Sequence, residues 1–406
     1  MKETLLQRSL CYSLVALLVT LLALTEPLQG APAALALPAV PPENGAQQPL
    51  IDVSTQELAV LYHNRENPII ERFSLKGELA VQWAAGTSDR GSYGSWDLPA
   101  NTRWQGLDVR RWRLGFDSRW FKCLKVWGAI DLNPRWDPFY KDIYELAASY
   151  SLGEAFALGV GKIKSQYFSQ EYNTRSRELV VFEQSLLVNA LVPRQLTAAW
   201  LNGKAGKGVY ALAAYAGDYE KEFSRFEAGA VVQASVGYDF AAVLEMDRAL
   251  VKFDWQGSTS ATNSDGPGRF SSAFSLNTTF QSGHFYGYTD LLGGIGRDTQ
   301  GDVWGVTLTP TYFLILNKLQ TVLRYQYAHG DDSGLALQNR YEALAPEIQD
   351  TKGAGSDYHA VYFGIVYYIY RHNFKLMTGV EYNDMTGGQK SFSGWTYLAG
   401  VGLAFL

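Results

Sequence analysis

Apolar and polar residues alternate position by position along much of the chain after residue 72. Around residues 73–83 the apolar set includes Phe73, Leu75, Val81 and Trp83, and mostly polar or small residues lie between its members. Successive side chains of a β-strand point to opposite faces, so this pattern predicts a strand with one apolar and one polar face. The pattern predicts sixteen strands, near residues 73–84, 106–120, 122–133, 142–151, 155–164, 195–203, 208–217, 227–238, 247–256, 270–280, 283–292, 302–313, 317–329, 357–370, 372–384 and 394–406.

The polar faces of these segments hold charges in mid-strand. Arg111 and Arg113 alternate with Trp112 and Leu114, for example. A soluble β-sandwich would also alternate, but its polar face would not so regularly carry charges between aromatic ends. The pattern therefore favours an all-β fold, a transmembrane antiparallel β-barrel with about 16 strands and an even strand number.

The connections between the predicted strands alternate in length. Counted from the first strand, the even ones are mostly tight, near Phe121, Gly153, Gly283, Asn317 and Arg371. The odd ones are longer and polar, at residues 85–105, 258–269, 330–356 and 385–393. Short periplasmic turns and long outer loops alternate in this way in outer-membrane barrels.

The start of the chain has the order of an export signal. Lys2 and Arg8 precede an apolar run over residues 12–24, and small residues follow from Gly30. The run is too short to span a bilayer as a helix, although an N-terminal anchor is the alternative. We expect a signal peptide at 1–33, a Pro- and Ala-rich periplasmic leader at 34–72, and a barrel domain at 73–406. This order predicts the outer membrane of a Gram-negative-type bacterium, with its lipid around the barrel.

Composition narrows the class further. Aromatic residues make up 14% of the chain, and after the signal no run of eighteen apolar residues occurs. High aromatic content without a helical span suits a barrel with aromatic girdles at both membrane interfaces. Only Cys123 remains after signal removal, so no intramolecular disulfide can form. A net charge of −5 argues against a nucleic-acid partner.

The last predicted strand ends in an alternating apolar pattern. Trp395, Tyr397, Val401, Leu403 and Phe405 share one face. A final strand that ends the chain in an aromatic residue resembles the assembly signal of outer-membrane barrels. Here the aromatic residue is penultimate, before the C-terminal leucine.

The connection at residues 165–194 is the third outer loop by count. It holds Glu171, Arg175, Arg177 and Glu183 and then an apolar run at 186–191. A sixteen-stranded barrel has a wide lumen, so selectivity needs an inward-folded segment and rings of charge. We expect this third loop to fold inward, with its apolar run against the wall. A solvated surface loop is the alternative.

Five stretches resemble one known family. They are RRWRLGF at 110–116, GVGKIK at 159–164, VFEQSLLVNALVP at 181–193, RYQYAHGDDSG at 324–334 and YRHNFKLMTGVEYNDM at 370–385. In order and spacing they resemble the phosphate-selective porin O and P family, over about residues 73–406.

The resemblance implies a passive channel for small anions, usually a homotrimer, whose arginines lead to lysines at a constriction. Guanidinium and ammonium groups suit phosphate because both donate charge-assisted hydrogen bonds to its oxygens. No cofactor, metal or catalytic residue is expected. The candidate anion-binding or channel-lining residues are Arg110, Arg111, Arg113, Arg119, Lys125, Lys162, Lys164, Arg175, Arg177, Lys252, Arg324 and Lys375.

Two features bear on phosphate selectivity. Acids also lie on the predicted lumen face, Glu78 and Asp117 among them, and these could pair with the bases. Strict alternation also places Lys162 and Lys164 on the lipid-facing side, with Val160. Because a lysine facing mid-membrane lipid costs about 2–4 kcal/mol, we expect a bulge or a position at the rim.

Two other functions remain to be distinguished. An outer-membrane hydrolase would need a nucleophile and a base, but no GxSxG elbow occurs near any of the five histidines. We therefore expect no enzyme. A general or sugar-type diffusion porin would use aromatic residues along the lumen in place of arginines, and the strand at 357–370 leaves that possibility open.

Overall fold

The computed structural model describes residues 59–93, 96–97, 102–220, 222–259, 267–336, 354–387 and 392–405. The predicted signal peptide and residues 34–58 of the predicted leader lie outside the described residues. The rest of the leader forms β1 (Val60–His63) and the beginning of β2 (Ile70–Tyr93). Within the described ranges, no helix has the length and apolar character needed to cross a membrane.

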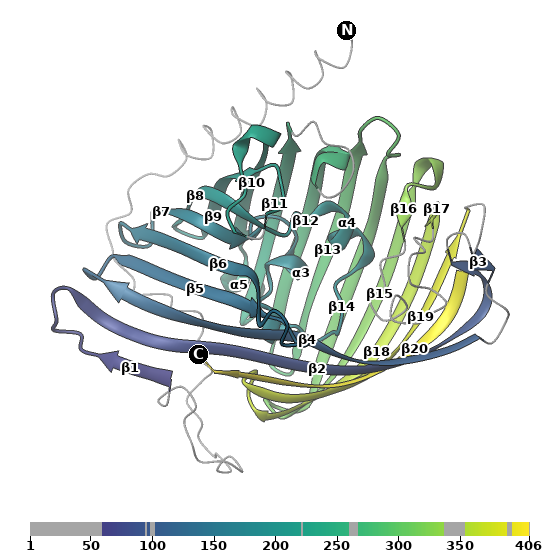
Figure 1. Ribbon diagram of the computed structural model, residues 1–406, viewed down its shortest axis with the longest axis horizontal. Coiled ribbons are helices and arrows are strands. Elements are labelled where there is room, and N and C mark those ends of the chain that lie inside the picture. Colours follow the sequence, from purple (N-terminus) through teal and green to yellow (C-terminus); the bar gives the residue numbers. More distant parts are fainter. Residues whose placement is uncertain are drawn as a thin grey trace, which may run out of the picture. The chain divides into compact units, whose positions relative to one another are not determined.

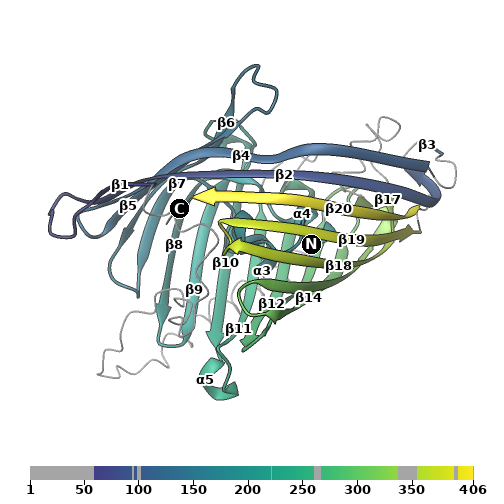
Figure 2. The ribbon, with the colours of Figure 1, turned by 90° about the horizontal axis from the view of Figure 1, so that it is seen from below.

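Sixteen strands form a closed antiparallel barrel (Figure 1). Each strand pairs with the next along the chain, and β20 pairs with β2 to close the ring (Figure 2). The sheet holds eighteen strands, of which β1 and β3 (Trp96–Asp97) pair only with β2, so sixteen make the ring. After β2 these are β4 (Thr102–Trp120), β5 (Leu124–Leu132), β6 (Tyr140–Ser151), β7 (Ala157–Lys164), β8 (Gln195–Ala205), β9 (Gly208–Ala216), β10 (Ala230–Asp239), β11 (Arg248–Ser258), β12 (Phe270–Ser282), β13 (Phe285–Gly296), β14 (Val303–Ile315), β15 (Leu319–Gly330), β18 (Asp357–Tyr370), β19 (Phe374–Thr386) and β20 (Phe392–Phe405).

The predicted barrel and its sixteen strands are confirmed. Most strand ends lie within a few residues of the prediction, and β2 is the main exception, ending at Tyr93 and not near residue 84. The pattern missed β1, β3 and a small two-stranded sheet of β16 (Leu335–Ala336) and β17 (Ala354–Gly355). These strands are two to four residues long, too short to show a period-two pattern.

Burial alternates along the strands as the polar pattern predicts. In β13, Tyr288, Asp290 and Leu292 are buried, whereas Leu291 and Ile295 between and beside them are exposed. The buried set faces the interior of the barrel, and the exposed apolar set faces outward. An outward apolar surface around a closed ring is the surface that lipid requires.

Two β-bulges break this alternation in β4 and β6, the two strands that flank β5. Ala80 of β2 pairs with Arg111 and Val81 pairs with Val109, so Arg110 is an extra residue in β4. Likewise Ala129 pairs with Glu145 and Ile130 pairs with Ile143, which leaves Tyr144 as an extra residue in β6. A bulge lets two consecutive side chains face the same side of the sheet. The sequence pattern did not predict either bulge.

The connections alternate between short and long. Tight turns join β4 to β5, β12 to β13 and β14 to β15, and the last two place Gly283 and Asn317 at φ 54° and 60°. Glycine and asparagine tolerate this left-handed conformation best. One even connection is longer, because α5 (Ala241–Leu244) lies between β10 and β11. The odd connections carry η2 (Phe226–Ala228), η3 (Pro267–Arg269) and η4 (Asp331–Ser333).

The ring closes between the two ends of the barrel sequence. β20 runs antiparallel to β2 from the pair Gly77–Phe405 to the pair Gly91–Phe392. A Cβ at Gly77 would lie 2.4 Å from the Phe405 ring, so only glycine leaves room for the ring at this position. The aromatic residue near the C-terminus therefore packs directly on the first strand of the ring.

Candidate functional site: the barrel interior

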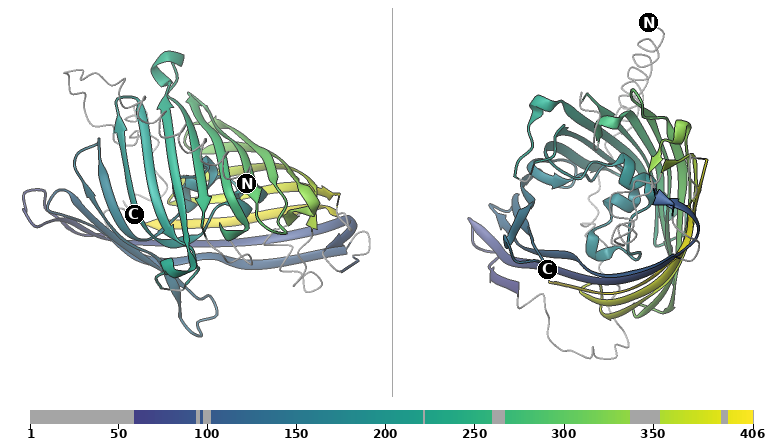
Figure 3. Two further views of the ribbon diagram at one scale, coloured as in Figure 1. Left: turned by 90° about the horizontal axis from the view of Figure 1, so that it is seen from above. Right: turned by 45° about the vertical axis from the view of Figure 1, so that its right-hand side comes forward.

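The connection between β7 and β8, residues 165–194, lies within the ring of strands (Figure 3). We call it the β7–β8 segment. It contains α3 (Gln170–Asn173), η1 (Ser176–Glu178) and α4 (Leu186–Leu191). Its hydrogen-bond partners lie on β2, β4, β11, β13, β15 and β19. None of these strands pairs with β7 or β8, which flank the segment in sequence.

An apolar side of the β7–β8 segment packs on the inner wall. Phe168, Val188 and Leu191 are almost fully buried there. Most wall residues of the same cluster, such as Phe270 and Leu292, come from β12 to β20, and Ala84 of β2 and Trp104 of β4 also belong to it. Burial of one such side chain contributes about 1.5–3 kcal/mol, so the cluster fixes this side of the segment against the wall.

Two wall carboxylates hold the start of α3. Asp290 accepts hydrogen bonds from the backbone N–H groups of Gln170 (2.8 Å) and Glu171 (3.0 Å), and from the hydroxyl of Ser169 (3.2 Å). Asp254 accepts from the Ser169 N–H at 3.1 Å. The first N–H groups of a helix have no partner within the helix, so these carboxylates replace the water they would otherwise bind.

Arg324 of β15 ties the same segment to the wall by charge. Its guanidinium lies 3.0 Å from the Glu171 carboxylate and 2.7 Å from that of Glu381 on β19. It also donates to the backbone carbonyl of Glu183 at 2.5 Å. All three side chains in these ion pairs are nearly inaccessible, with exposed fractions of 2% for Arg324, 0% for Glu171 and 9% for Glu381.

The opposite wall carries the arginines of β4. The bulge at Arg110 turns two consecutive arginines toward the interior. Arg110 makes a bidentate contact with Glu183 of the β7–β8 segment, at 3.0 and 3.2 Å, and Arg111 lies 3.7 Å from Glu78 of β2. Strict alternation would have sent Arg110 to the lipid, so the bulge explains how the RRWR motif places three arginines inside.

Arg113 is the most heavily contacted of the three. It lies 2.6 Å from Asp131 and 3.1 Å from Glu78, and its guanidinium stacks 3.5 Å from the centre of the Tyr144 ring. The bulge in β6 supplies that ring. Ser176 of the β7–β8 segment accepts a further bond at 3.3 Å. The possibility that wall acids pair with these arginines is therefore realised in the structure.

Further ion pairs line the same wall. Lys76 lies 3.9 Å from Glu145, and Lys125 lies 2.9 Å from Asp117. These side chains are 21–48% exposed although they face the interior, so water reaches this wall. Arg119 is exposed at the end of β4, beside the short connection to β5.

The two lysines of β7 lie at its outer end. Register with β8 is unbroken from Ala157 to Lys164, so β7 has no bulge. Lys162 donates to the carbonyl of Glu220 in the β9–β10 connection and is 3% exposed. Lys164 turns to the interior, where it donates to the Thr174 carbonyl and lies 4.3 Å from the centre of the Tyr172 ring. The unbroken register argues against the bulge alternative, and a position at the rim stays a prediction.

The β7–β8 segment also carries charged side chains that are accessible to solvent. Arg175 and Arg177 lie 3.5 and 3.8 Å from Glu178. Arg175 is 56% exposed, and it is the most accessible of the ion-paired arginines described here. Burial, with the neighbouring charge of Arg175, lowers the pKa of Arg177 below its ordinary value.

Besides Lys162, three candidate residues on the wall are buried and do not line an open channel. Lys252, Arg324 and Lys375 are 6%, 2% and 4% exposed. Arg324 and Lys375 contact the β7–β8 segment directly. Lys252 lies 3.6 Å from Asp254, and Lys375 donates to the Leu179 carbonyl. These contacts differ from the expectation that the three cations meet solutes: Arg324 and Lys375 bind the segment, and Lys252 binds its wall partner Asp254.

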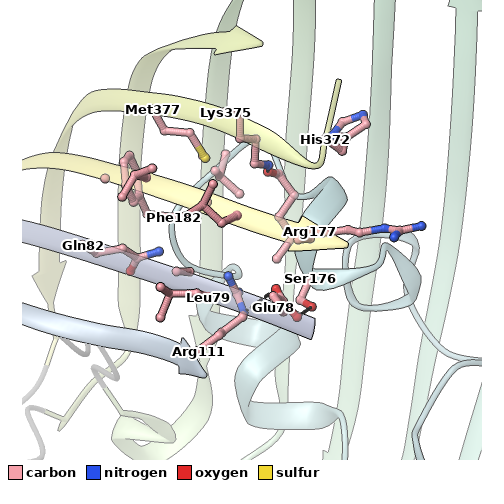
Figure 4. Close-up of a pocket in the computed structure, with 18 residues that line it drawn as sticks. Glu78, Leu79, Gln82, Arg111, Ser176, Arg177, Phe182, His372, Lys375 and Met377 are labelled. Carbon is pink, nitrogen blue, oxygen red and sulfur yellow. Dashed lines mark hydrogen bonds and ion pairs between the residues drawn. The ribbon is translucent and has the colours of Figure 1, made fainter. Parts of the chain in front are cut away.

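A small cavity of about 30 Å³ separates the tip of the segment from the wall (Figure 4). Glu78, Arg111, Arg177, His372 and Lys375 line it together with apolar residues. His372 lies in the connection between β18 and β19, and burial, with Lys375 and Arg177 nearby, lowers its pKa to about 3. Its imidazole is therefore neutral at physiological pH.

The sequence prediction missed several residues that hold the segment. Asp290 and Gln326 were not singled out, although Gln326 accepts from the Leu186 N–H at 3.0 Å. Ser165 accepts from the Gln233 amide at 2.6 Å. In the sequence, each of these strand residues is a large polar residue at a mid-strand position whose alternation predicts that it faces the interior. That pattern predicts the face of the sheet but not the hydrogen-bond partner.

The fold has counterparts among solved structures. OprB of Pseudomonas putida matches with a TM-score of 0.54 at 10% identity, over 82% of this chain and 94% of that one. OmpF of Salmonella typhi, in complex with daunomycin, matches with 0.54 at 10% identity, over 85% and 100%. The fold is that of an outer-membrane porin.

A further porin-fold match is the outer membrane channel DcaP of Acinetobacter baumannii. Its TM-score is 0.51 at 14% identity, over 84% of this chain and 100% of that one. No family model and no curated protein matches the chain. At these identities the likeness concerns the porin fold alone, and membership of the phosphate-selective family stays a prediction.

Proposed function

We propose that the protein is an outer-membrane porin, a passive channel through which small hydrophilic solutes diffuse. The observation that carries this proposal is the asymmetry of the barrel interior. On the side of β11 to β19, where the β7–β8 segment packs, the inward charged side chains of the ion pairs are only 0–9% exposed. On the side of β2 to β6, inward charged groups such as Lys125 and Asp117 are 48% and 28% exposed. A water-filled path between that wall and the segment accounts for the difference.

In this proposal the β7–β8 segment narrows the path. Its contacts with Glu78 and with the arginines of β4 bring it across the interior to the charged wall. Selectivity in such a pore comes from the charged groups that line its narrowest part.

The proposed solutes are small anions, with phosphate as one candidate. Among the ion-paired groups on this path, five bases are more than 20% exposed, namely Lys76, Arg110, Lys125, Arg175 and Arg177. Three acids pass the same mark, Asp117, Glu145 and Glu178. The excess of two exposed positive charges over negative ones supports a preference for anions. Because each arginine is paired with a carboxylate, we expect that preference to be modest.

The test is the reversal potential of the purified protein in planar bilayers under a potassium chloride gradient. We expect a potential of the sign that chloride preference gives, and a partial block of chloride current by added phosphate. A potential of cation sign, or no channels at all, contradicts the proposal.

A general or sugar-type diffusion porin is the second candidate. The near-complete charge pairing around Arg113 favours it, because paired charges attract neither ion strongly. A reversal potential near zero, together with uptake of neutral sugars into proteoliposomes, would support this candidate over an anion channel. In both cases we propose export by the predicted signal peptide and assembly as a homotrimer in the outer membrane.

A further inference from the structure

Arg324 was expected to meet solutes, but its contacts give it another role. One nitrogen of its guanidinium, Nη1, binds the carboxylate of Glu171 and the carbonyl of Glu183, and the other, Nη2, binds Glu381. Glu171 and Glu183 belong to the two arms of the β7–β8 segment, and Glu381 belongs to the wall. One buried side chain therefore joins both arms of the segment to the barrel.

Glu171 extends this connection within the segment. Its second carboxylate oxygen accepts from the backbone N–H of Ser185 at 2.9 Å, directly before α4. Glu171 itself lies in α3. The chain of contacts Arg324–Glu171–Ser185 thus links α3 and α4 and fixes both to β15.

The burial of this network makes its members depend on one another. A carboxylate left in a dry site without its cation is strongly disfavoured, so removing one partner of a buried pair destabilises the other. Without Arg324, Glu171 can recover hydration only if α3 leaves the wall. Movement of α3 also withdraws the Gln170 N–H from Asp290.

We propose that Arg324 is the positioning residue that holds the β7–β8 segment at its distance from the charged wall, and so sets the largest solute that passes. This inference rests on the proposed function as a diffusion channel. Arg324 touches no solute in this role; it acts through Glu171 and the backbone of the segment.

The experiment measures the size limit for neutral solutes, because uptake of uncharged sugars does not respond to changes of pore charge. Proteoliposome swelling rates are compared for a series from a monosaccharide to a tetrasaccharide. Arg324→Met and Glu171→Gln should both raise the relative rates for the larger sugars several-fold. Arg324→Lys, which keeps one ion pair, should give an intermediate limit.

Two matched variants complete the design. Arg225→Met removes an exposed arginine from the β9–β10 connection and should leave the size limit unchanged. Glu381→Gln removes only the wall partner of Arg324 and should lower barrel stability more than it alters the size limit. If Glu381→Gln alters the limit while Glu171→Gln does not, Arg324 serves wall packing and the proposal is overturned.

A failure of the Arg324→Met variant to fold does not leave the proposal untested. Glu171 lies outside the barrel strands, so Glu171→Gln tests the inference even where Arg324→Met fails to assemble. An unchanged size limit in a heat-modifiable, correctly folded Glu171→Gln barrel refutes the positioning role. Absence of both ion channels in planar bilayers and sugar uptake with the wild-type protein instead refutes the proposed function on which it rests.

Discussion

Replacement of Arg113 by methionine tests whether the charged wall of β2 to β6 controls ion passage. Arg111 and Arg113 face Glu78 and Asp131, so two positive charges balance two negative ones in this cluster. Arg113→Met leaves the cluster with one net negative charge. The variant Glu78→Gln leaves it with one net positive charge at almost unchanged side-chain volume.

The structure sets the expected size of the effect. An unbalanced unit charge acts on an ion 4 Å away with about 1 kcal/mol in water, which is about a fivefold change in that ion's partition. The effects on cation and anion are opposite and multiply, and screening at 0.1 M salt reduces them, so we expect about a tenfold shift in the permeability ratio. Arg113→Met should shift it toward potassium and Glu78→Gln toward chloride.

The assay is the reversal potential of each variant, with gel-shift temperature measured on the same preparation. Arg113→Met also loses two ion pairs and the stacking on Tyr144, at a cost of about 1–3 kcal/mol because the groups are partly hydrated. Lower stability with reversal potentials equal to wild type in both variants would refute the reasoning. The cluster would then hold the wall together without bordering the ion path.

Three further predictions follow from the interior and the fold. Deletion of residues Gln170 to Val180 should raise single-channel conductance, since it removes the part of the segment that crosses to the charged wall; unchanged conductance in a folded barrel would contradict this. Burial lowers the pKa of His372 to about 3 in the folded protein. As pH falls from about 6.5, the imidazole is protonated in the unfolded chain but not in the folded protein. The free energy of unfolding should therefore drop by up to about 1.4 kcal/mol per pH unit down to about pH 3. His372→Gln should flatten that part of the stability profile relative to wild type. The mature protein should show heat-modifiable gel migration and a β-rich circular dichroism spectrum, and a mainly helical spectrum would contradict the barrel.

The strands could be predicted because period-two alternation is a local property of the chain. The residues of each strand alone show which face is apolar and which is polar, independently of the strand it pairs with. The bulges at Arg110 and Tyr144 escape the pattern, because an extra residue is defined only against the register of the neighbouring strand.

The partners of the candidate site could not be predicted for a related reason. Arg324 and Glu171 are 153 positions apart, and Asp290 binds the N–H of Glu171 from 119 positions away. The sequence shows that these groups face the interior, but a charge buried against a distant partner looks the same as a charge that lines a channel. This is why three buried cations were expected to meet solutes.

The seam between β2 and β20 has a consequence for biogenesis. Gly77 and Phe405 are neighbours across it although 328 positions separate them in the chain, so the edge of β2 from Gly77 to Gly91 stays unpaired until β20 has been synthesised. β1 pairs only with the beginning of that edge, at residues 72–74. Contacts this distant form slowly, and an unpaired strand edge readily joins another chain. We therefore expect the edge of β2 to be the site most prone to wrong pairing during assembly, until Phe405 packs against it. Replacing Phe405 should accordingly lengthen the life of that unclosed intermediate more than it weakens the finished barrel.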